Sequence, residues 1–333
     1  MSGVLGGAPF PSVEPVETPS APTLSPNPVG NSGQSSRPGT ESRATPGATT
    51  VPPAESPEFP TGSAEDLFEN FTIDSNAGPL SAHSVRATGG KRGTVVFVHG
   101  FTGSKDDFRL LLPRAATLGW DAVAYSQRGH AGSAAPTGTE NYTLDQLAAD
   151  AANLALAIFE HCGGQLVHLV GHSLGGLVAR QAVLFRPDLF ASLTMLCSGP
   201  GGDDPTYHAE EAAYVREHGL VALFDRELRG RDPKPDDNFV RERFAASSAD
   251  AYLAGVDILQ NAPDTTAEVV ATGVPTLVAH GDADDAWPIA DQRDMAERLG
   301  AAYVVIPRAG HLPNIDNPDF TTECLSDFWT STS

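Results

Sequence analysis

The sequence predicts an α/β protein in which a mostly parallel sheet is flanked by helices and carries a helical cap insertion. Three observations predict this class. From residue 93 onward, short β-branched apolar runs alternate with longer segments of helical periodicity, as in parallel sheets covered by helices. A polar stretch of helical character interrupts that alternation between residues 199 and 272. Residues 1–62 are rich in Pro, Ser, Thr and Gly and almost lack large apolar side chains.

These shifts in composition divide the chain into four segments. Residues 1–62 are expected to form a disordered extension, because they cannot bury enough apolar surface to offset the entropy of ordering. Residues 63–198 and 273–333 are expected to form the two parts of one core. Residues 199–272 form the cap or lid. The alternative for this last segment is a plain surface excursion, but long insertions in compact domains are usually functional.

The strand candidates are short and strongly apolar, which is typical of buried parallel strands. They are Thr94–His99, Asp121–Tyr125, Leu166–Val170, Ser192–Cys197, Pro275–His280 and Ala302–Ile306. Two earlier amphipathic segments, Phe71–Asp74 and Ala82–Ala87, predict antiparallel edge strands.

The helix candidates repeat apolar residues at intervals of three and four, so each presents one face that can pack on the sheet. The two faces comprise Leu144, Leu147, Ala151, Leu154 and Ile158, and Phe108, Leu111, Leu112, Ala115 and Leu118. Thr143 followed by Gln146 is a capping-box pattern, and Asn317 followed by Pro318 marks the start of a helix near the end of the chain. The spacing of Val221, Phe224 and Leu228 is also helical, within the cap.

Charge and composition exclude several classes of partner. With 42 acidic and 21 basic residues, the net charge is −21, which argues against nucleic acid and against an anionic membrane surface. The first residues include no basic region followed by an apolar run, and no stretch of 18 apolar residues occurs. Cys162, Cys197 and Cys324 lie far apart, which fits a reducing compartment. We therefore expect a soluble, cytoplasmic protein whose cysteines act as small core side chains.

The strongest motif is Gly171-His172-Ser173-Leu174-Gly175-Gly176, which follows the strand candidate Leu166–Val170 and precedes a helical run. A G-x-S-x-G sequence in this position is typical of a nucleophile elbow. The two glycines leave room for the sharp turn that lifts Ser173 above the sheet. The alternative, an ordinary glycine-rich turn, is less favoured because suitable partners follow downstream.

A serine hydroxyl needs a base within hydrogen-bond reach, because it stays protonated at neutral pH. His311 is favoured because it follows the last strand candidate, in the loop Ala309-Gly310-His311 that returns to the carboxyl edge of the sheet. His99, His168, His172 and His280 are interpreted as strand-end or packing histidines. None shows the spacing of metal ligands, so neither a metal nor a cofactor is expected.

An acidic residue should orient the histidine, and the segment after Pro275–His280 contains three candidates, Asp282, Asp284 and Asp285. We favour Asp284, the third residue after Gly281, because it has room to point back toward His311. Backbone N–H groups of Phe101 and Leu174 are the candidate oxyanion hole. Phe101 lies in a glycine-bracketed loop directly after a strand, and Leu174 follows the nucleophile at a helix start.

Together, the HGF loop, Ser126-Gln127-Arg128-Gly129-His130, GHSLGG, HGDADD and AGH resemble the α/β-hydrolase superfamily over about residues 65–331. The HGFTGS loop and modest cap are similar to the carboxylesterase and monoacylglycerol lipase branch, which implies hydrolysis of carboxylic esters. Some members place the acid after the preceding strand, which makes Asp203 or Asp204 a further alternative. Ser126 and Ala131 depart from the Asp and Gly usual in relatives, so a structural hydrogen bond there is expected to differ. Ser173 itself excludes the branches that use an aspartate nucleophile.

The resemblance implies an acyl-enzyme mechanism acting on a small-molecule ester of small or medium size. Cap residues Val221, Leu223, Phe224, Phe239 and Phe244 are expected to shelter an apolar acyl chain. Acyl transfer, carbon–carbon bond hydrolysis and cofactor-free haloperoxidase-like chemistry use the same fold and stay open as alternatives. A non-catalytic binding module is the least favoured interpretation. The natural substrate and the oligomeric state are not determined by the sequence.

Overall fold

The computed structural model describes residues 68–202, 204–229, 231–232, 234 and 237–333. The predicted extension, residues 1–62, lies outside them. Within the described part, eight strands form one sheet in the order β1-β2-β4-β3-β5-β6-β7-β8. They are β1 (Glu69–Ile73), β2 (Leu80–Val85), β3 (Gly93–Val98), β4 (Trp120–Tyr125), β5 (Val167–His172), β6 (Phe190–Leu196), β7 (Thr276–Gly281) and β8 (Ala302–Ile306).

Strand directions match the sequence prediction. β1 and β2 pair antiparallel with each other, and β2 pairs antiparallel with β4. From β4 to β8 every pairing is parallel. β3, β4, β5 and β7 are buried along their whole length and β6 at all but one position, so these strands are mostly apolar rather than alternating. The prediction of an α/β fold with a mostly parallel sheet is confirmed.

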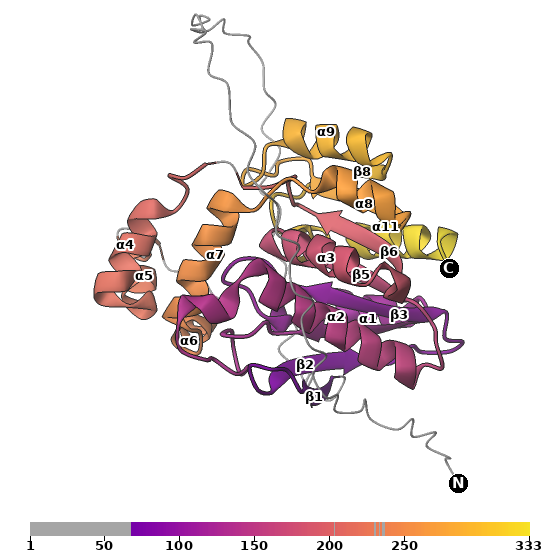
Figure 1. Cartoon of the computed structure of the whole chain (residues 1–333), viewed down its shortest axis with the longest axis horizontal. Helices are drawn as coiled ribbons and strands as arrows, with labels where there is room; N and C mark the ends of the chain where they lie inside the picture. Colours follow the sequence, from indigo (N-terminus) through magenta and orange to yellow (C-terminus); the bar gives the residue numbers. More distant parts are fainter. Residues whose placement is uncertain (1–67, 203, 230, 233, 235–236) are drawn as a thin grey trace, which may run out of the picture. The chain divides into compact units, whose positions relative to one another are not determined.

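Helices cover both faces of the sheet (Figure 1). One face packs against α2 (Leu144–His161), α3 (Leu174–Phe185), α8 (Thr266–Thr272) and α9 (Ile289–Leu299). The other packs against α1 (Leu111–Thr117) and α11 (Pro318–Ser331). Short elements complete the core: the 3₁₀ helices η2 (Lys105–Phe108), η3 (Thr139–Tyr142) and η4 (Pro187–Leu189), and α10 (Pro313–Asp316).

Two predicted helix features differ in detail. Leu118, assigned to the packed face of the second helix, is 38% exposed, because α1 ends at Thr117 and Leu118 already belongs to the turn beyond it. Asn317 does precede Pro318 at the start of α11, but its side chain donates to the Pro307 carbonyl instead of capping the helix. Thr143 caps α2 as predicted, accepting from the Gln146 amide.

The cap consists of α4 (Ala209–His218), α5 (Leu220–Glu227), α6 (Asp237–Ala245) and α7 (Ala249–Asn261), which stand on the left in Figure 1. Its own small core includes Leu223, Phe224 and Phe244, packed with Tyr252 and Val256. Phe239, which is expected to shelter substrate, lies outside this small core. It is 37% exposed, and the guanidinium groups of Arg109 and Arg243 lie over its ring.

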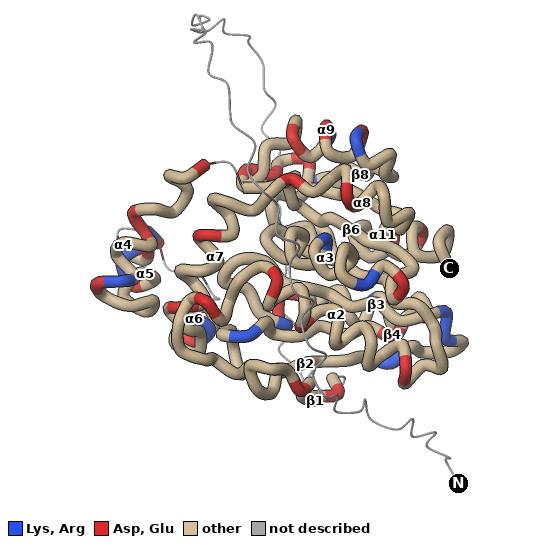
Figure 2. The backbone as a smooth tube through the Cα atoms, in the orientation of Figure 1, with Lys and Arg blue, Asp and Glu red and all other residues tan. Residues whose placement is uncertain are grey.

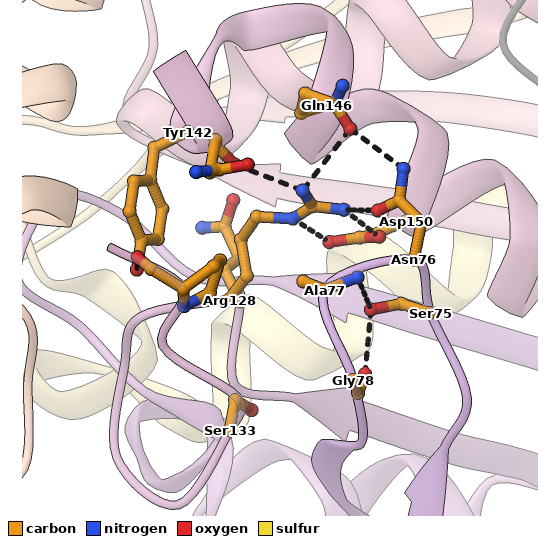
Figure 3. Close-up of polar contacts among 12 residues, drawn as sticks. Ser75, Asn76, Ala77, Gly78, Arg128, Ser133, Tyr142, Gln146 and Asp150 are labelled. Atoms are coloured by element: carbon orange, nitrogen blue, oxygen red, sulfur yellow. Dashed lines mark hydrogen bonds and ion pairs between the residues drawn. The ribbon is translucent and has the colours of Figure 1, made fainter. Parts of the chain in front are cut away.

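A buried arginine network anchors the loop that follows β4 (Figure 3). Arg128 donates from Nε and Nη2 to the two carboxylate oxygens of Asp150, both at 2.7 Å, and both residues are almost fully buried. Arg128 also reaches Asn76 and Gln146. The Gln146 side chain is therefore committed to Arg128 and does not complete the capping box of α2. The two hydrogen bonds between Arg128 and Asp150 offset the desolvation free energy of burying both charges.

Candidate active site

Ser173 lies in the turn between β5 and α3, as the motif predicts. Its backbone has φ 54° and ψ −124°, a sparsely populated conformation for a residue other than glycine. The turn is possible because Gly171 and Gly175 pack against backbone: a Cβ at Gly171 would collide with the Gly175 carbonyl, and one at Gly175 would collide with the carbonyls of Val98 and His99. Ser173 is 7% exposed. This is the geometry of a nucleophile elbow.

His311 and Asp284 lie in hydrogen-bond contact. The ring nitrogen Nδ1 of His311 is 2.9 Å from Asp284 Oδ1, and because a carboxylate can only accept, Nδ1 carries the proton. That tautomer leaves a lone pair on Nε2. The Asp284 side chain is fully buried, whereas that of His311 is 21% exposed. A base oriented by a buried carboxylate is the arrangement that general-base catalysis requires.

Further donors hold Asp284 ionised. Its carboxylate accepts from the amides of Ala286 and Trp287 and from Nε2 of Gln292. Burial raises the pKa of Asp284, but the hydrogen bonds from His311 and Gln292 outweigh it and lower the pKa to about 2. The carboxylate therefore stays charged at neutral pH and stabilises a protonated imidazole.

The other carboxylate candidates lie elsewhere. Asp282 is exposed and accepts from the amides of Arg308 and Ala309, which fixes the start of the loop that carries His311. Asp285 is exposed. Asp204 is also exposed, and its carboxylate accepts from the Thr206 amide and hydroxyl, so it does not contact His311. Asp203 lies outside the described residues.

The two candidate oxyanion donors flank Ser173. Leu174 is the first residue of α3, a position whose N–H has no acceptor within the helix. Phe101 follows Gly100, and a Cβ at Gly100 would lie 2.9 Å from the Ser173 Cβ, so this loop passes directly beside the serine. The Gly100–Phe101 loop and the start of α3 therefore both lie beside Ser173.

His99 holds the Gly100–Phe101 loop in place through hydrogen bonds, a role that the sequence did not reveal. Its Nδ1 donates to the Gly100 carbonyl, and its Nε2 accepts from the Gln127 amide. The Gln127 side chain in turn donates to the His99 carbonyl. Burial lowers the pKa of His99 well below its usual range, so the ring is neutral and can donate and accept at once. The Gly100–Phe101 peptide is thereby preoriented.

Ser126 and Ala131, which depart from the usual Asp and Gly, lie in the segment that follows β4. Ser126 Oγ accepts from the Lys105 amide at 3.3 Å, and the Ser126 carbonyl accepts from Ser133 Oγ at 2.6 Å. The hydroxyl therefore ties β4 to the segment that follows the Phe101 loop. Ala131 itself is half-buried in the turn after His130.

Helix α7 closes over the site. The Phe101 ring packs on Tyr252, with centroids 4.7 Å apart, and a Cβ at Gly255 would lie 2.8 Å from the Phe101 ring. A cavity of about 10 Å³ remains between Phe101, Leu174, Ala251 and Gly255. A larger groove of about 600 Å³ runs between the start of α2 and the cap helices α4 and α7, and Tyr142 lines both spaces.

Two further side chains lie beside His311, and the sequence had not singled either out for chemistry. His172 Nε2 donates to the His311 carbonyl at 2.7 Å, and burial lowers the pKa of His172 to about 4. Cys197 follows β6, is fully buried, and has φ 50°. A ring nitrogen of each histidine and the Cys197 sulfur lie within 4.8 Å of one another. Only the parallel packing of β5, β6 and the loop after β8 brings them together.

The fold agrees with comparisons to known proteins. A family model described as the alpha/beta hydrolase family matches residues 95–323. The chain belongs to this family. The uncharacterised hydrolase YugF of Bacillus subtilis (strain 168) is 36% identical over 259 residues, which cover 71% of this chain and 90% of that protein.

Other members of the family differ in the reactions their names give. The 3-oxoadipate enol-lactonase 2 of Acinetobacter baylyi is 24% identical over 204 residues, which cover 59% of this chain and 73% of the relative. A thermophilic esterase from Thermogutta terrifontis superposes with a TM-score of 0.65 at 23% identity, covering 79% of this chain and 99% of the esterase. At that identity the superposition supports the fold alone.

The structure also bears on membrane association. Among the helices of the described residues, none is both long enough and apolar enough to cross a membrane.

Proposed function

We propose that the chain is a serine hydrolase that cleaves carboxylic esters of small or medium acyl groups through an acyl-enzyme. The observation that carries the proposal is the 2.9 Å hydrogen bond from His311 to the buried Asp284, on the same edge of the sheet as Ser173 in its strained turn. Three free cysteines agree with a reducing compartment such as the cytoplasm.

The reaction follows from the proton positions. Because Asp284 holds the proton of His311 on Nδ1, Nε2 is free to take the proton of Ser173 Oγ as that oxygen attacks the ester carbonyl. The amides of Phe101 and Leu174 donate to the developing oxyanion. The imidazolium then protonates the leaving alcohol, and the same nitrogen afterwards activates the water that hydrolyses the acyl-enzyme.

The space beside the site favours short acyl groups. The cavity bounded by Phe101, Leu174 and Gly255 holds about 10 Å³, which is close to the room that one water molecule needs. We therefore expect the specificity constant kcat/KM to be highest for the shortest esters.

The test is hydrolysis of a chain-length series of nitrophenyl esters by the wild type and by Ser173→Ala, together with labelling by a fluorophosphonate probe. Labelling and turnover that both depend on Ser173 would support the acyl-enzyme. Analysis of the products with an added alcohol separates hydrolysis from acyl transfer. Absence of both labelling and turnover in folded wild-type protein would overturn the proposal in favour of a binding module.

A further inference from the structure

The cluster of His172, Cys197 and His311 combines the donor types that zinc prefers. Zn²⁺ binds imidazole nitrogen and thiolate sulfur in tetrahedral sites, with bond lengths of about 2.0–2.3 Å that place neighbouring ligand atoms about 3.3–3.8 Å apart. Here one nitrogen of each ring and the Cys197 sulfur already lie within 4.8 Å of one another. Adjustments of about an ångström would close the site around an ion. His311, the most exposed of the three, can supply part of this by rotation.

The hydrogen bonds around the two rings resemble those of metal-binding histidines. Such a ring usually donates its second N–H to a carboxylate or a backbone carbonyl, which fixes the tautomer. His172 donates to the His311 carbonyl, and His311 donates to Asp284. Each ring therefore has a lone pair on its other nitrogen.

The net charge also favours a cation. The chain has a net charge of −21, and Figure 2 shows acidic residues spread over many elements, including α4, α6 and α9. A negative field raises the local concentration of cations.

We propose that His172, Cys197 and His311 bind a single thiophilic divalent cation of the zinc type, and that the bound ion switches the enzyme off by occupying His311. The inhibitory half of this inference rests on the proposed function, in which His311 is the base. Binding of the ion itself does not. A ring that ligates a metal cannot accept the Ser173 proton, so hydrolysis and metal binding exclude each other.

Binding of the cation is expected to release one proton from Cys197. A free cysteine is mostly in the thiol form at neutral pH, whereas a metal ion binds the thiolate. The cation forms a bond to sulfur as the S–H proton leaves to solvent. Affinity for the ion is therefore expected to rise with pH, and one proton is released for each ion bound.

The experiment titrates the full chain, without a histidine tag, with Cd²⁺ and Zn²⁺. Ultraviolet absorption from the cadmium–thiolate bond reports binding without any need for activity, and the rate of fluorophosphonate labelling reports access to Ser173. We expect one equivalent of Cd²⁺ to bind, labelling to slow in proportion, and a chelator to restore it. Loss of a residue that only hydrogen-bonds to a metal ligand typically lowers metal affinity about 10–100-fold. Cys197→Ser removes a proposed ligand itself, so it is expected to weaken binding at least about 10-fold.

Matched controls separate the site from other thiols. Cys324→Ser removes a partly buried cysteine on α11 and is expected to bind Cd²⁺ like the wild type. His311→Gln retains Cys197 and is expected to bind more weakly, which covers the case that Cys197→Ser fails to fold. Wild-type protein without the thiolate absorption, or with an affinity unchanged by Cys197→Ser and His311→Gln, would overturn the binding site. Binding without slower labelling would overturn the inhibition alone.

Discussion

The carboxyl and amino edges of the parallel sheet differ in backbone strain and in the kind of side chains that they bury. At the carboxyl edge, Ser173 and Cys197 hold positive φ angles, and buried polar groups gather around Asp284. At the amino edge, Trp120, His168 and Trp329 pack their rings together, with centroids 5.1–6.1 Å apart. Strain and polarity thus lie at the edge where the proposed function places the substrate, and dense aromatic packing lies at the other edge. We infer that the amino edge stabilises a fold whose carboxyl edge is destabilised for chemistry.

The largest expected effect is the loss of turnover on changing Ser173. Both Ser173→Ala and Ser173→Gly should lower kcat about 10⁴-fold or more, because the nucleophile is lost. Only Ser173→Gly should relieve the backbone strain at φ 54°, raising the free energy of unfolding by about 1 kcal/mol. Denaturant unfolding of the two variants checks this difference. Equal stabilities would show that the turn at Ser173 is not strained.

The second-largest loss of turnover is expected on changing Asp284, the proposed acid. Asp284→Asn keeps the size of the side chain but no longer stabilises the correct tautomer and charge of His311, so kcat should fall about 10⁴-fold while the fold persists. Asp285→Asn is the matched control: the residue is exposed, and its turnover should match that of the wild type. Ester hydrolysis by both variants decides the matter. A strong loss in Asp285→Asn would contradict the assignment of Asp284.

The amino edge should show the reverse behaviour. Trp329 is fully buried against Phe97, Trp120 and His168, so Trp329→Ala should lower the free energy of unfolding by about 3–5 kcal/mol. Turnover per folded molecule should stay within about twofold of the wild type, since the side chain lies far along the strands from Ser173. Denaturant unfolding measures the free energy of unfolding, and active-site titration gives the turnover per folded molecule. A matched loss of activity in the folded fraction would break the contrast between the edges.

The smallest expected effect is a pH dependence of stability, to which one buried histidine at each edge contributes. Burial lowers the pKa of His168 at the amino edge and of His172 at the carboxyl edge to about 4, from 6.5. The unfolded chain therefore binds protons more readily below pH 6.5, and stability present above pH 6.5 is lost as the pH falls toward 4. Each histidine contributes up to about 1.4 kcal/mol per pH unit in that window. Unfolding of His168→Gln between pH 6.5 and 4 should show a shallower slope, and an unchanged slope would contradict the shift.

Part of the site was predictable because its signals are local. The elbow requires glycine on either side of a serine between a strand and a helix, so Ser173 is evident from consecutive residues. His311 follows from chain order after the last strand. Among three neighbouring carboxylates, the choice of Asp284 was a prediction from loop length. The structure brings that residue, and neither Asp282 nor Asp285, into contact with His311.

Other features depend on contacts between distant segments. Phe239 resembles the other apolar cap residues in the sequence, yet it lies outside the small core of the cap and contacts two guanidinium groups. The fixed Gly100 peptide depends on His99 and Gln127, which come from neighbouring strands. No spacing in the sequence indicates either arrangement.

The sequence alone determined the parallel sheet, the elbow and the histidine after the last strand, because periodicity and turn chemistry act over a few residues. The tertiary structure alone decided which side chains from different strand ends share a volume. His172, Cys197 and His311 are separated by 25 or more positions, and only the parallel alignment of β5, β6 and β8 brings their donor atoms together. That proximity is a property of sheet order, which no local pattern encodes.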